Sequence, residues 1–299
     1  MKQFYILLLL AALSCPLCAQ SVYNVPFSLS DSTFIIGSVY TARIELTADH
    51  RDVAEQSKPS LDSIAAFIIS HPQLVLELGA HTDLRGNDSS NLVLSQLRAE
   101  KIKKYLVSKG VQPQMLPAVG YGETKPLMMQ GNIDRVKDAA QQEALHQRNH
   151  RCEFRILYLY RNGVFSLTDT AFTPGAIMRL NVLFDLRAPT VRPESNALID
   201  SLARFLIAHP KLKVEIGNHT DTRGSDNMNN RNSLERAQSI AARLRAQGVP
   251  ESQVFVKGYG ATQTLVSKKY LFELKSRSSH EQFHQLNKRT EVKIISNGK

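Results

Sequence analysis

The sequence predicts an α+β protein made of two tandem copies of one domain, each a small mixed sheet with helices on one face. Three observations predict this fold. The chain has 299 residues, enough for about two domains. Sequence motifs recur along the chain at a constant interval of 138 residues. Within each copy, hydrophobic patterns typical of strands alternate with patterns typical of helices.

The internal repeat sets the expected domain boundaries. The recurring pairs align without gaps and include His81-Thr82-Asp83 with His219-Thr220-Asp221, Arg98-Ala99 with Arg236-Ala237, and Gly120-Tyr121-Gly122 with Gly258-Tyr259-Gly260. We therefore assign copy one to residues 22–160 and copy two to residues 161–299. Each copy has the size of an ordinary domain and must bury its own core, unlike the short units of a solenoid.

Hydrophobic periodicity in copy two predicts strands and helices in alternation. Strands are expected at residues 180–184, 212–217, 254–258 and 291–295. Two helices separate them, with apolar faces formed by Leu198, Leu202, Phe205 and Leu206, and by Ala237, Ile240 and Leu244. His209-Pro210 ends the first helix and Gly248 ends the second.

Copy one repeats this order of elements. Its helices carry Leu61, Ile64, Ala65 and Ile68, then Leu92, Ala99, Ile102 and Leu106, and its strands are expected at residues 74–78, 117–120 and 153–159. The stretches 127–147 and 265–285 are loop or additional helix, and the pattern leaves both alternatives open.

The first twenty residues predict export. Lys2 precedes an apolar run over residues 4–13, and a secretory signal over residues 1–19 is the expected interpretation. The run is too short to span a bilayer, and no later stretch is apolar enough to do so. The alternative is a lipoprotein signal with Cys15 as the acylated residue, against which the order of Ala12 and Leu13 argues.

Composition excludes several classes of protein. With 42% hydrophobic and 21% charged residues, the chain is neither collagen-like nor disordered as a whole. The net charge of +10 favours polyanions such as nucleic acid, anionic lipid or an acidic wall polymer, without choosing among them. Beyond the signal only Cys152 remains, in an apolar run, so we expect a buried strand residue and no disulfide or cysteine metal site.

Two charged residues stand out in each copy by their positions. Asp83 follows a strand, and Arg98 lies beside the core stripe of the next helix, from which its side chain is expected to reach the strand end. Asp221 and Arg236 repeat this spacing, and we expect Asn91 and Asn229 in the loop before each helix. A carboxylate and a guanidinium held near each other make a receptor for a zwitterion, such as an amino acid head group.

These motifs resemble a known family. The residues that carry the resemblance are His81-Thr82-Asp83, Leu94-Ser95-Gln96-Leu97-Arg98-Ala99, Gly120-Tyr121-Gly122-Glu123 and Asn149-His150-Arg151, with their counterparts in copy two. In sequence and order they resemble the OmpA-like peptidoglycan-binding domain of Gram-negative envelopes. The resemblance implies an α+β domain that holds the diaminopimelate side chain of the peptidoglycan stem peptide without covalent chemistry and without a cofactor. It implies a periplasmic protein associated with the cell wall and outer membrane, with peptidoglycan rather than nucleic acid as its partner.

The resemblance also assigns roles to residues. It places ligand-binding residues at Asp83, Asn91, Arg98 and Arg151 in copy one, and at Asp221, Asn229, Arg236 and Arg289 in copy two. His81, Thr82, His219 and Thr220 are supporting residues of the same turns. The two His-x-Asp sequences offer too few ligands for a metal, so we expect histidines that orient the turn.

The chain departs from the family pattern at several positions, which leaves open whether both copies bind equally. Ala80 and Asn218 replace the usual glycine before His-Thr-Asp, and His150 and Lys288 replace the first arginine of the Asn-Arg-Arg motif. The Phe-Asp segment of the family is present in copy two as residues 184–185, whereas copy one has residues 45–47, Glu-Leu-Thr, in that region.

Three functions therefore remain open at this level. The leading hypothesis is a non-enzymatic anchor or organiser that binds the wall through two sites. Through avidity, the two sites together would bind more tightly than either alone. The second is a wall hydrolase, although no nucleophile, metal or paired-carboxylate motif supports an enzyme. The third is that one copy, most readily copy one, has become a module for contact with an outer-membrane protein.

Overall fold

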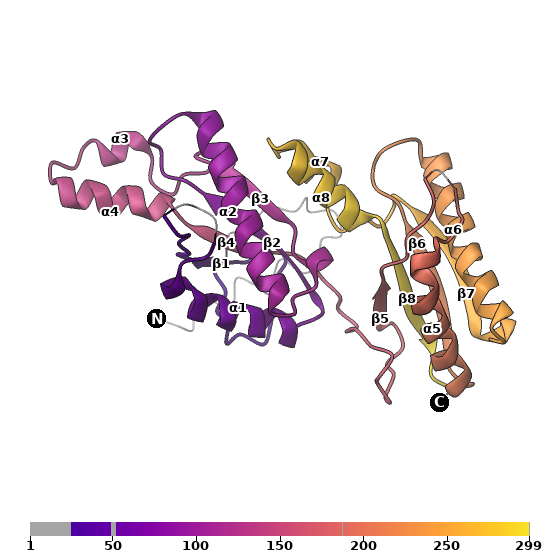
Figure 1. Ribbon diagram of the computed structural model, residues 1–299. Helices are drawn as coiled ribbons and strands as arrows, with labels where there is room; N and C mark the ends of the chain where they lie inside the picture. Colours follow the sequence, from indigo (N-terminus) through magenta and orange to yellow (C-terminus); the bar gives the residue numbers. More distant parts are fainter. Residues whose placement is uncertain (1–24, 49–51, 187, 299) are drawn as a thin grey trace, which may run out of the picture.

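The computed structural model describes residues 25–48, 52–186 and 188–298, so the predicted signal at residues 1–19 and Cys15 lie outside the described residues. Figure 1 shows two sheets, each with its own long helices, joined through a pair of short helices that lie between them. Each sheet has four strands and mixes parallel and antiparallel pairs. The predicted α+β fold with two tandem units is confirmed.

The sheet of copy one has the order β1-β4-β2-β3. Its strands are β1 (Val39–Ala42), β2 (Leu74–His81), β3 (Ala118–Gly122) and β4 (Cys152–Leu159). Strand β2 is parallel to β3 and antiparallel to β4, which pairs antiparallel with β1. Helices α1 (Lys58–Ser70) and α2 (Asp88–Ser108) cover one face and enclose a core that includes Leu61, Ile64, Leu76, Leu78 and Ile102.

Copy two has the same topology, with the order β5-β8-β6-β7. Its strands are β5 (Ile177–Leu180), β6 (Lys213–His219), β7 (Val254–Gly260) and β8 (Arg289–Ser296). Helices α5 (Asn196–Ala208) and α6 (Asp226–Ala246) pack on one face over Val214, Ile216, Val292 and Ile294. As predicted, α5 ends before His209, and α6 ends before Gly248, which has a φ of 94°.

The prediction of a strand at residues 180–184 is wrong in position, because β5 ends at Leu180. Beyond it the backbone folds back on itself: the Asp185 N–H donates to Thr190 O at 2.9 Å, and the Arg192 N–H donates to Leu183 O at 2.9 Å. These local bonds leave Phe184 in an isolated bridge with Val191, outside the sheet. Val182 and Phe184 of this run pack against the core of copy two without joining the sheet.

The two stretches that the sequence left open are both helical. Copy one forms α3 (Gln130–Ile133) and α4 (Ala139–Asn149), and copy two forms α7 (Lys268–Phe272) and α8 (Arg277–Asn287). Single 3-10 turns complete the elements at η1 (Glu55–Ser57), η2 (Pro113–Met115), η3 (Pro193–Ser195) and η4 (Glu251–Gln253). Within the described part of the chain, no helix combines the length and apolarity needed to cross a membrane.

Helices α7 and α8 of copy two cover the second face of the sheet of copy one (Figure 1). Val75, Val119 and Tyr121 of that face form one buried cluster with Leu271 and Phe283. Copy two leaves its own equivalent face open, and there the residues that match Val75 and Val119 are the exposed Lys213 and Lys257. The two copies have therefore diverged on this face of the sheet. It is apolar in copy one, where helices bury it, and charged in copy two, where it is exposed.

Polar contacts fix this interface as well. Tyr121 Oη donates to Glu77 at 2.8 Å, and Tyr270 Oη of α7 donates to the same buried carboxylate. Gln282 of α8 accepts from the Ala118 N–H at 2.9 Å and donates to Ala118 O at 3.2 Å. Because the buried polar groups are paired across the interface, the two copies form one unit rather than two independent domains on a linker.

Candidate functional site

The His-Thr-Asp turn has the same geometry in both copies. Strands β2 and β6 end at His81 and His219, whose rings stack on Tyr121 and Tyr259 with centroids 5.0 and 4.7 Å apart. Burial lowers the pKa of both histidines, so they are neutral at pH 7.

The contacts around these histidines hold the turn in place. Nε2 of His81 lies 3.6 Å from Glu153, and Nε2 of His219 lies 3.2 Å from Glu291. The next residues, Thr82 and Thr220, are buried, and the N–H of each donates to the last glycine of the Gly-Tyr-Gly motif at 3.0 and 2.9 Å. Among the described residues no group of three or more acidic, histidine or cysteine side chains gathers into a possible metal site.

The aspartates that follow are already engaged by an arginine two residues on. Asp83 accepts from the Arg85 N–H at 3.0 Å and from its guanidinium at 2.5 Å, and Asp221 accepts from Arg223 at 2.9 and 2.6 Å. Burial opposes ionisation of both carboxyl groups, but these hydrogen bonds outweigh it and lower the pKa of each. Sequence reasoning missed Arg85 and Arg223, although the Asp-x-Arg spacing recurs in both copies and was available as a signal.

Asn91 and Asn229 lie in the first turn of α2 and α6, not in the preceding loop as predicted. The helices begin earlier because Asn87 and Ser225 cap them through side-chain oxygens that accept from backbone N–H groups. Nδ2 of each asparagine donates at 3.0 Å to the carbonyl of Arg85 or Arg223. The asparagines therefore hold the loop that carries the aspartate.

Arg151 and Arg289 are buried, and each of their side-chain nitrogens donates a hydrogen bond. Their Nε atoms donate to Glu153 at 2.8 Å and to Glu291 at 2.6 Å. In each arginine, Nη1 donates to the carbonyl two residues earlier in the chain and Nη2 donates to the carbonyl 26 residues earlier. These four bonds measure 2.9 to 3.2 Å. In this structure both arginines join the last strand to the preceding loop, so a direct ligand contact stays a prediction.

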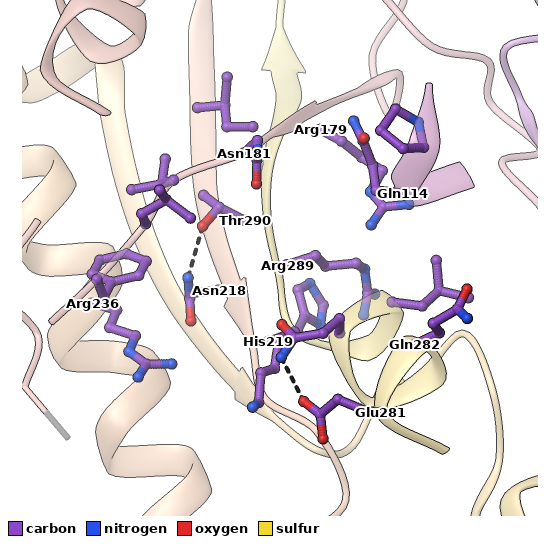
Figure 2. A pocket seen from close by; sticks show the side chains of 18 of the residues that line it. Gln114, Arg179, Asn181, Asn218, His219, Arg236, Glu281, Gln282, Arg289 and Thr290 are labelled. Atoms are coloured by element: carbon purple, nitrogen blue, oxygen red, sulfur yellow. Dashed lines mark hydrogen bonds between the residues drawn. The ribbon is translucent and has the colours of Figure 1, made fainter. Parts of the chain in front are cut away.

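Arg98 and Arg236 occupy equivalent positions in the sequence, but their burial and contacts differ. Arg98 is only 8% exposed, and its Nη1 donates to His81 O at 3.3 Å, so it does reach the end of the strand. Arg236 is less buried and lies 5.1 Å from the ring of Phe184 at the edge of an open cavity (Figure 2). Burial lowers the pKa of Arg236, and the negative charge of Asp221 partly opposes this shift, so the two residues lie within electrostatic range of each other.

The residues around Asp83 and Arg98 in copy one differ from their counterparts in copy two. His150 occupies the position that Lys288 has in copy two. The charges of Arg98 and Asp83 both affect the pKa of His150. Arg43 lies just before residues 45–47, which replace the Phe-Asp pair in copy one. Its guanidinium donates to Glu45 and to Gln147 of α4, each at 3.1 Å. In copy two the corresponding segment, Leu183 to Asp185, is apolar at two positions and lines the cavity instead.

The cavity at copy two has a volume of about 700 Å³ and is lined by both copies. Copy two contributes Arg236, Lys288 and the Phe184 segment, and copy one contributes Lys103 and η2. Nζ of Lys288 lies 3.1 Å from Asp221, which places an ammonium group on the aspartate. Cys152 lies apart from this site: it is buried in β4 as predicted, and burial raises the pKa of its thiol to about 11.

Lowering the pH from 7 to 5 is expected to destabilise copy one through His150. Burial and then the charge of Arg98 lower the pKa of His150 from 6.5 to about 4. The unfolded chain therefore binds this proton below pH 6.5 and the folded chain only near pH 4, so stability falls across that window. At pH 5 the loss is roughly 1 to 2 kcal/mol, reduced by solvent screening. Urea unfolding at both pH values should show a smaller loss for His150→Gln, and equal losses would contradict the assignment.

Comparison with known proteins matches this geometry to one family. The family model described as the OmpA family matches residues 48–139 and 183–271, which together make up more than half of the chain. The chain is 38% identical over 89 residues to outer membrane porin F of Pseudomonas fluorescens, covering 28% of this chain and 27% of the relative. It is 35% identical over 79 residues to a peptidoglycan-associated lipoprotein of Buchnera aphidicola, covering 26% of this chain and 46% of the relative.

A solved structure, the peptidoglycan-associated lipoprotein from Burkholderia pseudomallei, is 28% identical with a TM-score of 0.32, covering 38% of this chain and 87% of that chain. The chain spans less than half the length of the two curated relatives above. Both matched segments of the family model fall on the repeated unit, one in each copy. The chain belongs to the OmpA family.

Proposed function

We propose that this protein binds peptidoglycan without covalent chemistry, through the diaminopimelate of the stem peptide, and anchors or organises the cell envelope from the periplasm. The proposal draws on the family and on relatives named as envelope proteins. It assigns ligand contact to the aspartate and arginine of each turn. The arginine of copy two, Arg236, is more exposed than Arg98, whereas its aspartate, Asp221, is more buried than Asp83.

One observation carries the proposal: the Asp221 and Arg236 pair of copy two is complementary to a zwitterion, and its arginine lines the open cavity. Asp221 already holds an ammonium group, that of Lys288, at 3.1 Å. The ammonium of a diaminopimelate head group has the same chemistry and takes the place of Lys288. No described carboxylate lies within ion-pair distance of Arg236, so its guanidinium can donate two parallel hydrogen bonds to the ligand carboxylate.

Copy one presents its pair differently. Arg98 is buried and bonded to His81 O, and the charges of Arg98 and Asp83 both act on His150. Asp83 is more exposed than Asp221, which also holds Lys288. We therefore expect the two sites to be unequal, with Arg236 the more available of the two arginines.

The proposal is tested by co-sedimentation of residues 20–299 with purified diaminopimelate-type peptidoglycan at moderate salt. Wild type is expected to pellet, and the double variant Asp83→Ala with Asp221→Ala is expected to remain in the supernatant. The variant is more basic, so nonspecific attraction to an anionic wall would strengthen rather than weaken. Equal pelleting of both proteins would overturn the assignment of the aspartates. Clearing of the wall polymer in a zymogram would instead show a hydrolase.

A specific observation favours one additional role for copy one, that of a protein-interaction module. Helix α2 exposes Val93, Leu94 and Leu97, at 70%, 37% and 37%. The matching residues of copy two are Arg231, Asn232 and Glu235, which are polar or charged. Exposed apolar side chains gathered on one helix face are typical of a contact surface. If wild type fails to pellet with peptidoglycan, this surface becomes the leading candidate for a protein partner.

A further inference from the structure

The sheet of copy two has one face turned away from α5 and α6, and this face carries a group of basic and apolar side chains. Strands β6, β7 and β8 contribute Lys213, Phe255, Lys257, Lys293 and Ile295, which together we call the basic face. Their side chains lie there because the residues that alternate with them along each strand pack in the core of copy two. Phe255 is 48% exposed and Ile295 is 42% exposed, so the apolar members of the group are accessible.

The same face of copy one is built to receive a protein element. Helices α7 and α8 pack on it (Figure 1), and Val75 and Val119 belong to the buried cluster that results. The positions of these two valines are taken in copy two by Lys213 and Lys257, both exposed. A helix pair packed on copy two in the same way would bury two ammonium groups and remove their hydration, which is costly. The exchange of valine for lysine therefore argues against a second helix pair as the occupant of this face.

The chain does not neutralise the charge of the basic face. In the part of the chain that the structure describes, Lys213, Lys257 and Lys293 form no ion pair with a carboxylate, and Nζ of Lys257 lies 4.7 Å from the ring centre of Tyr259. One carboxylate on the same face, Glu215, accepts a hydrogen bond from Tyr259 Oη at 2.6 Å. With three lysines and this one carboxylate, the face keeps a positive net charge and is complementary to an anionic surface.

We propose that the basic face binds the surface of a membrane that contains anionic phospholipid. At such a surface the ammonium groups stay hydrated among the phosphates, which attract them, so the cost of burying lysine does not arise. Phe255 and Ile295 lie between the lysines and enter the boundary between headgroups and acyl chains. This contact is separate from the His-Thr-Asp turn, because Lys213 begins β6 whereas Asp221 follows the end of that strand. A protein with both sites connects the cell wall to a membrane.

A fluorescent reporter on the basic face tests the contact directly. The chain contains no tryptophan, so Phe255→Trp provides a single indole on this face. Residues 20–299 with this change are mixed with vesicles of equal parts phosphatidylglycerol and phosphatidylcholine, or of phosphatidylcholine alone. The emission is expected to shift to shorter wavelength only with the anionic vesicles, as the indole leaves water. The matched control is Phe272→Trp on α7, where Phe272 is 90% exposed but lies outside the basic face, and its emission should not shift.

Charge variants separate the basic face from the overall positive charge of the protein. Lys213→Gln with Lys257→Gln is expected to weaken co-sedimentation with the anionic vesicles roughly 20-fold, because each lysine near an anionic surface contributes about fivefold. The control, Lys104→Gln with Lys137→Gln, makes the same change in net charge at two exposed positions outside the face and should bind as wild type does.

Every outcome of these experiments supports the membrane contact or overturns it. Equal losses for the two double variants would show that only net charge matters, and the basic face would then be wrong. Failure of wild type to bind the anionic vesicles would overturn the proposal and leave an acidic protein as the occupant of this face. Neither result would affect peptidoglycan binding, which the co-sedimentation with purified wall measures separately.

Discussion

Gly258→Ala is expected to destabilise copy two by about 3 kcal/mol or more, at the upper end of the usual cost of overpacking. A Cβ at this position would lie 2.4 Å from Leu234 N and 2.7 Å from Leu234 Cα, both on the backbone of α6. The helix cannot retreat freely, because the hydroxyl of Ser233 accepts from the Gly260 N–H at 2.9 Å. Chemical denaturation monitored by circular dichroism measures the loss.

The control for this variant is Gly131→Ala in α3. A Cβ there meets no atom within 4 Å, and alanine is preferred over glycine in a helix, so stability should stay the same or rise slightly. Gly120→Ala repeats the test in copy one, where the Cβ would lie 2.2 Å from Gln96 N. If Gly258→Ala were as stable as wild type, the close approach of strand and helix would not be a requirement of this fold.

Arg236→Met is expected to weaken binding to diaminopimelate-type peptidoglycan by roughly 30- to 100-fold, equivalent to about 2 to 3 kcal/mol for a charged hydrogen-bonding partner. The guanidinium lies within electrostatic range of Asp221, and methionine removes its charge and its cation–π contact with Phe184 while keeping an unbranched apolar side chain. Arg236→Lys should recover only part of the affinity, because an ammonium cannot bind a carboxylate through two parallel hydrogen bonds. Co-sedimentation over a range of protein concentrations measures both.

Two variants make this prediction specific. Arg231→Met removes the same charge from an exposed position of the same helix, where Arg231 pairs with Glu235, and it should bind as wild type does. Arg98→Met in copy one should change binding far less than Arg236→Met, because Arg98 is buried against His81 O. Equal losses for Arg98 and Arg236 would show that both sites are open in solution.

The interface between the copies changes how tandem sites act together. A flexible linker would let each site search for its own stem peptide, with avidity set by linker length. Here α7 and α8 hold the two sheets through a buried cluster and through the shared Glu77 carboxylate. The relative positions of the two sites are therefore fixed by packing, and only ligand spacings that match them can use both sites.

The amino-acid sequence alone was enough to predict the fold, the repeat and which residues of the two copies correspond. Each of these depends on local patterns: the period of apolar residues, the helix stops at His209 and Gly248, and a constant offset between motifs. Buried Cys152 followed in the same way, because a residue in an apolar strand run is expected in the core.

The different surroundings of the two sites and the cavity between the copies could be seen only in the tertiary structure. In copy one Arg43 donates to Gln147, a residue 104 positions away in the chain. The cavity of copy two depends on Lys103 and η2 of the other copy, brought there by the packing of α8 on the sheet of copy one. Such long-range contacts leave no periodic signal in the sequence, since they depend on how whole elements pack rather than on the spacing of neighbouring residues.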